Sequence, residues 1–163
     1  WVNLPAKDKM TTPKYQGITN VQINKFELPE NGGVIEVIAG EYENIKGTAA
    51  TFTPVYLLNT KLNKGAKASF NFPANYNTAL LVIEGSVKVN DIKNISTDHF
   101  ALFENEGEEF TIEATENTVV LVLSGEPIEE PIVAHGPFVM NTQTEIMQAF
   151  YDMNIGKFGY LED

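Results

Sequence analysis

Short strand-like segments separated by glycine follow one another along most of the chain, and this pattern constrains the fold most strongly. Nine segments rich in Val, Ile, Phe, Tyr and Thr recur at intervals of about ten residues, with no helical period between them. They cover residues 18–28, 34–42, 50–60, 66–72, 78–85, 86–90, 99–105, 108–114 and 118–125. Such segments are typical of antiparallel barrels and sandwiches. The sequence therefore predicts an all-β barrel over residues 18–125.

The start of the chain differs from this strand pattern. Residues 1–17 contain Pro5, Pro13 and Gly17, which oppose helix, so we expect an extended inter-domain connector there. The chain opens on Trp1, without an initiator Met or an apolar leader. We interpret this start as a cut end, with any targeting signal upstream.

The end of the chain, residues 126–163, is predicted to be a return segment followed by one helix. Thr142 and Glu145 have the spacing of a capping box, in which each side chain bonds the other residue's free backbone N–H. We therefore expect a short helix over residues 141–154. Its apolar stripe has the spacing i, i+3, i+4 and i+7, at Ile146, Ala149, Phe150 and Met153. The stripe packs either on this chain's own barrel or on another surface.

Composition excludes several classes of function. The 163 residues suit one domain with a substantial core. A net charge of −11 opposes the neutralisation of phosphates, so we expect no direct binding of nucleic acid. The chain contains no Cys, which removes disulfides and thiol nucleophiles and fits a cytoplasmic protein. No apolar run approaches the roughly 18 residues of a membrane-spanning helix, so we expect no membrane partner.

Gly65 and Gly85 stand in the glycine-to-glycine frame of a cupin barrel's first motif, which this stretch resembles. In a metal-binding cupin, two His and a Glu of this frame and a His of the second motif hold a divalent metal. The four corresponding positions here are Asn71, Pro73, Thr78 and Phe110. Proline and phenylalanine side chains cannot coordinate a metal. The resemblance therefore implies a barrel without a metal site or catalytic residues.

Two interpretations of the barrel interior remain open. Side chains fill it completely, or Asn71, Thr78 and Phe110 line a small pocket with a polar edge. An acidic stretch nearby could form a weak cation patch, but such loops are usually a solvated face; its members are Glu104, Glu106, Glu108 and Glu109.

The two ends of the chain carry a more specific resemblance. WVNLPAKDK at the start, SGEPIEEPIVAHGPFVMNT at 124–142 and EIMQAFYDMNIGKFG at 145–159 resemble the second half of pirin-family proteins. The resemblance implies a cupin-type double-stranded β-helix, or jelly-roll barrel, that forms the C-terminal half of a bicupin. In that family the N-terminal cupin holds one iron on three His and one Glu. Bacterial members are similar to quercetin 2,3-dioxygenases, and animal members resemble iron-dependent cofactors of transcription factors.

We therefore expect a metal-free structural and interaction half, with no cofactor of its own. The rival hypothesis is a metal-dependent dioxygenase that uses His99, His135 and carboxylates, or a cupin that binds a small molecule. The expected partner is the missing N-terminal cupin or a second copy of the chain, so the chain alone should self-associate. The candidate interface residues are Trp1, Val2, Leu4, Ile146, Phe150 and Met153.

Overall fold

The computed structural model describes residues 2–159, which form two compact units. The barrel unit comprises Lys14–Pro127, and the terminal unit combines residues 2–13 with residues 128–159. The predicted connector is thus divided between the units at Pro13. From Lys14 onward it is held on the barrel unit by Gln16, whose side-chain amide makes two hydrogen bonds with the backbone of Ala50, at 2.9 and 3.0 Å.

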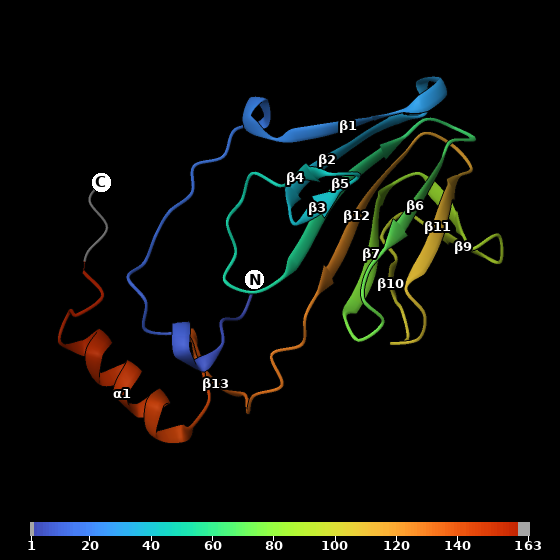
Figure 1. The fold of residues 1–163 in the computed structure, drawn as a ribbon. Helices are drawn as coiled ribbons and strands as arrows, with labels where there is room; N and C mark the ends of the chain where they lie inside the picture. The colour runs from blue at the N-terminus through green and yellow to red at the C-terminus, as the bar shows by residue number, and fades with distance from the viewer. Residues whose placement is uncertain (1, 160–163) are drawn as a thin grey trace. The chain divides into compact units, whose positions relative to one another are not determined.

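Two antiparallel sheets form the barrel unit (Figure 1). The six-stranded sheet has the order β1 (Asn24–Leu28), β2 (Gly33–Ala39), β5 (Val55–Leu62), β12 (Thr118–Gly125), β7 (Asn77–Glu84) and β10 (Phe100–Leu102). The four-stranded sheet has the order β6 (Lys67–Asn71), β11 (Glu109–Ala114), β8 (Ser86–Val89) and β9 (Lys93–Ser96). A small hairpin of β3 (Glu41–Tyr42) and β4 (Ile45–Lys46) follows β2, and short 3₁₀ turns occupy Asn20–Gln22 and Pro29–Asn31.

Alternating side chains fill the space between the two sheets. Along β12, Val120 and Val122 are fully buried, whereas Leu121 and Leu123, which alternate with them, are half-buried on the outer face. Buried residues also alternate along β5, β6 and β11, and together with those of the other strands they form one continuous apolar core. Its members include Ile35, Val37, Leu58, Leu80 and Val82 from the six-stranded sheet, and Phe70, Val87, Phe110 and Ile112 from the four-stranded sheet. The prediction of an all-β barrel is confirmed.

Several strand bounds differ from the prediction for local reasons. The segment expected from residue 18 becomes β1 only at Asn24, because a 3₁₀ turn capped by Thr19 precedes it. The segment expected from residue 50 begins as β5 at Val55, directly after Pro54. The structure adds β9, which the sequence did not indicate because Ile95 is its one apolar residue.

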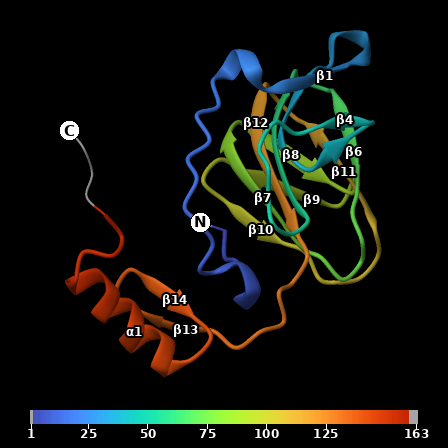
Figure 2. The ribbon, with the colours of Figure 1, turned by 60° about the vertical axis from the view of Figure 1, so that its left-hand side comes forward.

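The terminal unit contains a 3₁₀ turn at Ala6–Asp8, the hairpin β13 (Val133–His135) and β14 (Phe138–Met140), and the helix α1 (Gln143–Asn154) (Figure 2). The expected helix is confirmed, together with its capping box. The Thr142 backbone N–H donates to Glu145 Oε2 at 2.7 Å, and the Glu145 N–H donates to Thr142 Oγ1 at 3.2 Å. The hairpin was not predicted. Within residues 2–159, no helix has the length and apolar character that would be needed to span a membrane.

Candidate functional site

Aromatic rings occupy the part of the barrel interior where β6 and β11 meet. Along β6, Phe70 points inward and Asn71 is exposed; Phe72, just past the strand, is buried again. On β11, Phe110 lies directly opposite Phe70 in the register and is 6% exposed. Phe103, which follows β10, packs against this cluster from the other sheet. We call Phe70, Phe72, Phe103 and Phe110 the aromatic cluster.

Phe110 is the centre of the aromatic cluster. Its ring centroid lies 4.5 Å from that of Phe103, 5.1 Å from Phe70 and 6.1 Å from Phe72. The interplanar angles of 22° with Phe70 and 34° with Phe103 describe offset or tilted stacking. Phe72 continues the cluster to Tyr56, with centroids 4.8 Å apart. The rings therefore form a packed layer across the interior.

The four residues at the cupin metal-ligand positions lie in different environments. Asn71 is exposed, and its Nδ2 donates to Glu109 Oε1 at 3.2 Å. Pro73 is exposed on the following loop. Thr78 is buried, and its Oγ1 lies 2.8 Å from the Ser124 hydroxyl, so each hydroxyl has a partner. Only Thr78 and Phe110 are therefore buried together.

Two cavities open beside Phe110, and they separate the residues of the predicted pocket. Thr78 and Phe110 line a space of about 80 Å³. Asn71 and Phe110 line a larger one of about 500 Å³. Asn71 and Thr78 do not share a cavity. The smaller space has room for water but not for a flavonoid-sized ligand, which needs several hundred cubic ångströms.

The residues at the ligand positions do not fit a metal ion. Phe110 presents only aromatic carbon, and Pro73 has no donor atom on its side chain. Thr78 and Asn71 carry neutral oxygens, and the Thr78 hydroxyl is already bonded to Ser124. Within residues 2–159, no group of three or more His, Asp or Glu side chains is arranged to hold a metal.

Carboxylates surround the larger cavity. Glu41, Glu43 and Glu109 line it together with Tyr42. Burial, with a contribution from the Glu43 charge, raises the pKa of Tyr42 to about 12. The Tyr42 hydroxyl donates to the Ser69 carbonyl oxygen at 3.1 Å, so Tyr42 stays a neutral part of the wall. The predicted acidic stretch lines the smaller cavity, with Glu104, Glu106, Glu108 and Glu109.

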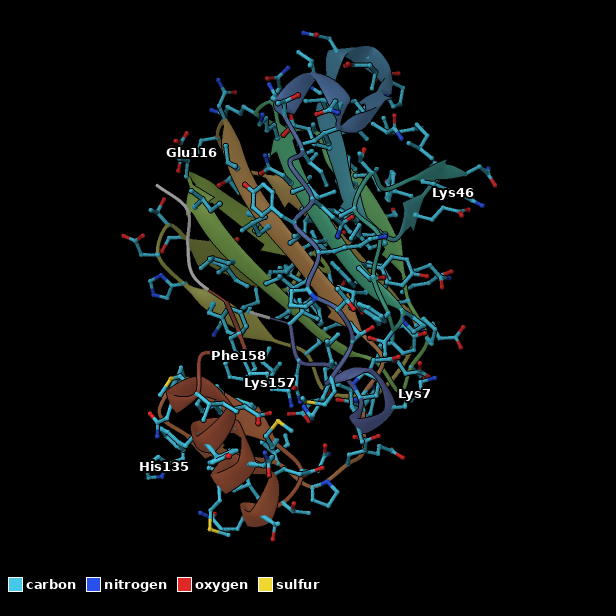
Figure 3. The ribbon with its side chains drawn as sticks, turned by 90° about the vertical axis from the view of Figure 1, so that its left-hand side faces the viewer. Lys7, Lys46, Glu116, His135, Lys157 and Phe158 are labelled. Atoms are coloured by element: carbon cyan, nitrogen blue, oxygen red, sulfur yellow. The ribbon has the colours of Figure 1, made fainter. Side chains whose placement is uncertain are left out.

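The two histidines belong to different units. His99 precedes β10 in the barrel unit, where its Nδ1 lies 3.0 Å from the Thr97 carbonyl oxygen. The Ser96 hydroxyl oxygen also lies 3.3 Å from this nitrogen, so His99 is held against its own turn. His135 ends β13 in the terminal unit, is exposed (Figure 3), and sets its ring edge-on against Phe150 of α1, with centroids 5.4 Å apart. Both side chains therefore make local structural contacts.

A charged cluster that the sequence did not indicate lies on the outer face of the six-stranded sheet. Glu36 is only 4% exposed, and it forms ion pairs with Lys25 at 3.1 Å and Lys61 at 3.0 Å. Asn59 Nδ2 donates to the same carboxylate at 2.7 Å. Burial raises the pKa of Glu36, but the hydrogen bonds from Lys61, Asn59 and Lys25 outweigh it and hold that pKa below its usual value.

Comparison with known proteins identifies the family. The Pirin C-terminal cupin domain matches residues 57–159, which is more than half of the chain. The chain belongs to the pirin family. It is 36% identical to human pirin over 165 residues, and 37% identical to Pirin-1 of Arabidopsis thaliana over 166 residues. The crystal structure of a quercetin 2,3-dioxygenase from Acinetobacter baumannii matches 99% of this chain with 46% identity and a TM-score of 0.92.

The relatives are much longer than this chain. The matches cover 56% of human pirin, 57% of Arabidopsis Pirin-1 and 56% of the Acinetobacter baumannii protein. The family match and the structural match confirm the expected cupin-type jelly-roll barrel with a short C-terminal helix. This chain thus corresponds to the C-terminal cupin domain of pirin-family proteins.

The predicted interface residues of this pirin domain differ in exposure. Val2 and Met153 are exposed, Leu4 and Phe150 are half-buried, and Trp1 lies outside the described residues. Ile146 is buried, because only 2% of it is accessible. It lies on the buried side of α1, the helix that packs on β13 and β14.

Proposed function

We propose that this chain is the metal-free half of a pirin-type protein and acts as a structural and interaction domain. The iron, and any quercetin 2,3-dioxygenase activity, would belong to an N-terminal cupin. The relatives are long enough to contain such a domain, because the match to this chain covers only 56% of their length. The partner would be that cupin or a second copy of the chain.

The aromatic cluster is the observation that carries this proposal. A catalytic metal site needs imidazole or carboxylate ligands around an open coordination position. Phe110 stands at one ligand position and stacks on Phe70 and Phe103, so aromatic carbon occupies the place of a metal-ligating side chain. The other ligand positions offer an exposed amide, a proline and a hydroxyl that is already hydrogen-bonded.

An assay of quercetin consumption tests the proposal against its rival. The purified chain, incubated aerobically with quercetin and iron(II), should consume quercetin no faster than the buffer with iron alone. The full-length Acinetobacter baumannii relative is the positive control for the assay conditions. Oxygen-dependent loss of quercetin that follows the concentration of the chain would favour the dioxygenase hypothesis.

The histidines give the rival hypothesis little support. It needs His99 and His135 to bind one metal together with carboxylates. Within residues 2–159, neither histidine belongs to a group of three or more His, Asp or Glu side chains that could hold a metal ion. The variants His99→Ala and His135→Ala should therefore leave the metal content of the purified chain unchanged.

A further inference from the structure

The larger cavity beside Phe110 is lined only by residues of the barrel unit. It encloses about 500 Å³ between the β3–β4 hairpin, the strands β6 and β11, and the turn after β8. Sites for small organic ligands usually enclose roughly 300–1,000 Å³. The cavity therefore has the size of a ligand site, and the proposed function makes no use of it.

The β3–β4 hairpin supplies one wall of this cavity, and Tyr42 holds that wall in place. The Tyr42 hydroxyl donates to the Ser69 carbonyl oxygen at 3.1 Å, which ties β3 to the edge strand β6. The Tyr42 ring packs against Phe26 and Phe70, with centroids 5.3 and 5.5 Å apart. Because these contacts lie within the protein itself, the wall is formed before any ligand arrives.

Three carboxylates from two elements line the cavity. Glu41 and Glu43 belong to the hairpin, and Glu109 begins β11. Among the described residues, no Lys or His lines this space, and none of the three carboxylates forms an ion pair. The electrostatic potential in the cavity is therefore negative, and the net charge of −11 on the whole chain adds to it.

Aromatic rings line the cavity beside these carboxylates. They are Phe70, Phe72 and Phe110 of the aromatic cluster. Aromatic rings attract cations through their π-systems, and they also contact apolar groups favourably. A ligand that combines a positive charge with an apolar body would therefore satisfy both parts of the wall.

A metal ion does not suit the same residues. A divalent cation such as Ca²⁺ needs several oxygen ligands within about 2.6 Å of one centre. Within residues 2–159, no group of three or more His, Asp or Glu side chains is arranged to provide that. The carboxylates are instead spread around the cavity, where they suit an organic cation that is larger than a single ion.

We propose that this cavity, with its carboxylates Glu41, Glu43 and Glu109 and its aromatic rings, binds a small organic ammonium compound that has an aromatic or other apolar body. The ammonium group lies among the carboxylates, and the apolar body lies against the rings. This inference goes beyond the proposed function. It needs neither a metal nor a partner domain, so its failure would leave the proposed function standing.

Amide chemical shifts of the nitrogen-15-labelled chain test this proposal. Phenethylammonium is the probe, titrated at pH 7 and low ionic strength, and 2-phenylethanol is the neutral probe of matched shape. We expect saturable shifts at Asn71, Asn90 and Thr111, which line the cavity, with an affinity about tenfold or more higher for the ammonium probe. Equal affinity for the two probes, or no saturable shift at these residues, would overturn the proposal.

Paired variants separate the cavity from the general charge of the chain. Glu43→Gln with Glu109→Gln removes two charges at the cavity, whereas Glu27→Gln with Glu84→Gln removes two at positions of the barrel unit that do not line it. All four side chains are exposed, so both proteins should fold. The first pair should weaken phenethylammonium binding by about fivefold or more, and the second by less than about twofold. Equal weakening by the two pairs would overturn the proposal, because it would assign the binding to overall charge.

Discussion

Replacing Phe110 by Ala measures how far the aromatic cluster holds the barrel together. Phe110 is 6% exposed and contacts Phe70, Phe72 and Phe103. Truncating a buried Phe to Ala costs about 3–5 kcal/mol, and each aromatic pair contributes roughly 0.5–1.5 kcal/mol beyond the area that it buries. Because Phe110 adjoins two cavities, water can enter part of the vacated space. We therefore expect the lower end, about 3 kcal/mol.

Urea unfolding at pH 7, followed by near-ultraviolet circular dichroism of the barrel's aromatic residues, provides the assay. A loss of about 3 kcal/mol corresponds to a fall in midpoint of about 1–3 M for ordinary urea slopes. The matched control is Phe52→Ala, the same change at an exposed position of the barrel unit, which should alter stability by less than about 0.5 kcal/mol. A loss below about 1 kcal/mol for Phe110→Ala would refute the packed interior and favour an open pocket.

Three further changes test other parts of the structure. Glu36→Gln should lower the free energy of unfolding by about 1–2 kcal/mol at pH 7, measured by urea unfolding. Because the pKa of Glu36 in the folded protein lies below the usual 4.5, the difference between the two proteins should persist above pH 4.5 and decrease as the pH falls below 4.5. A constant difference down to pH 3 would contradict the ion-pair cluster. Thr142→Ala should weaken α1 by about 1 kcal/mol, seen as faster amide exchange confined to the terminal unit. Gly85→Ala should destabilise the barrel more than Gly65→Ala in the same urea assay. Both glycines have positive φ, but of the two only Gly85 would place a Cβ against the backbone, 2.4 Å from the Asn117 carbonyl oxygen. Equal losses of stability would refute this steric argument.

The barrel could be predicted because its strands are strongly patterned. TVVLVLSG, which forms β12, alternates as a half-buried strand should, and the helix was indicated by the Thr142 and Glu145 capping box. The hairpin β13–β14 could not be found this way. Its strands have three residues each, and they lie among prolines that usually mark an irregular segment.

The site was less predictable, because side-chain direction depends on register. The glycine frame identified the four positions but did not show that Phe70 and Phe72 point inward while Asn71 is exposed. The cluster around Glu36 depends on strand pairing: the register places Glu36 opposite Lys25 on one side and Asn59 on the other. From the sequence alone, Glu36 was one polar residue in an apolar strand.

The metal content of this domain tests the central claim most directly. The purified chain is loaded anaerobically with excess iron(II) or zinc, passed through a desalting column, and measured by inductively coupled plasma mass spectrometry, with the full-length Acinetobacter baumannii relative treated in parallel. We predict far less than one metal per chain, because the residues at the cupin ligand positions, Asn71, Pro73, Thr78 and Phe110, supply no imidazole or carboxylate. One tightly held iron or zinc ion per chain would contradict the account.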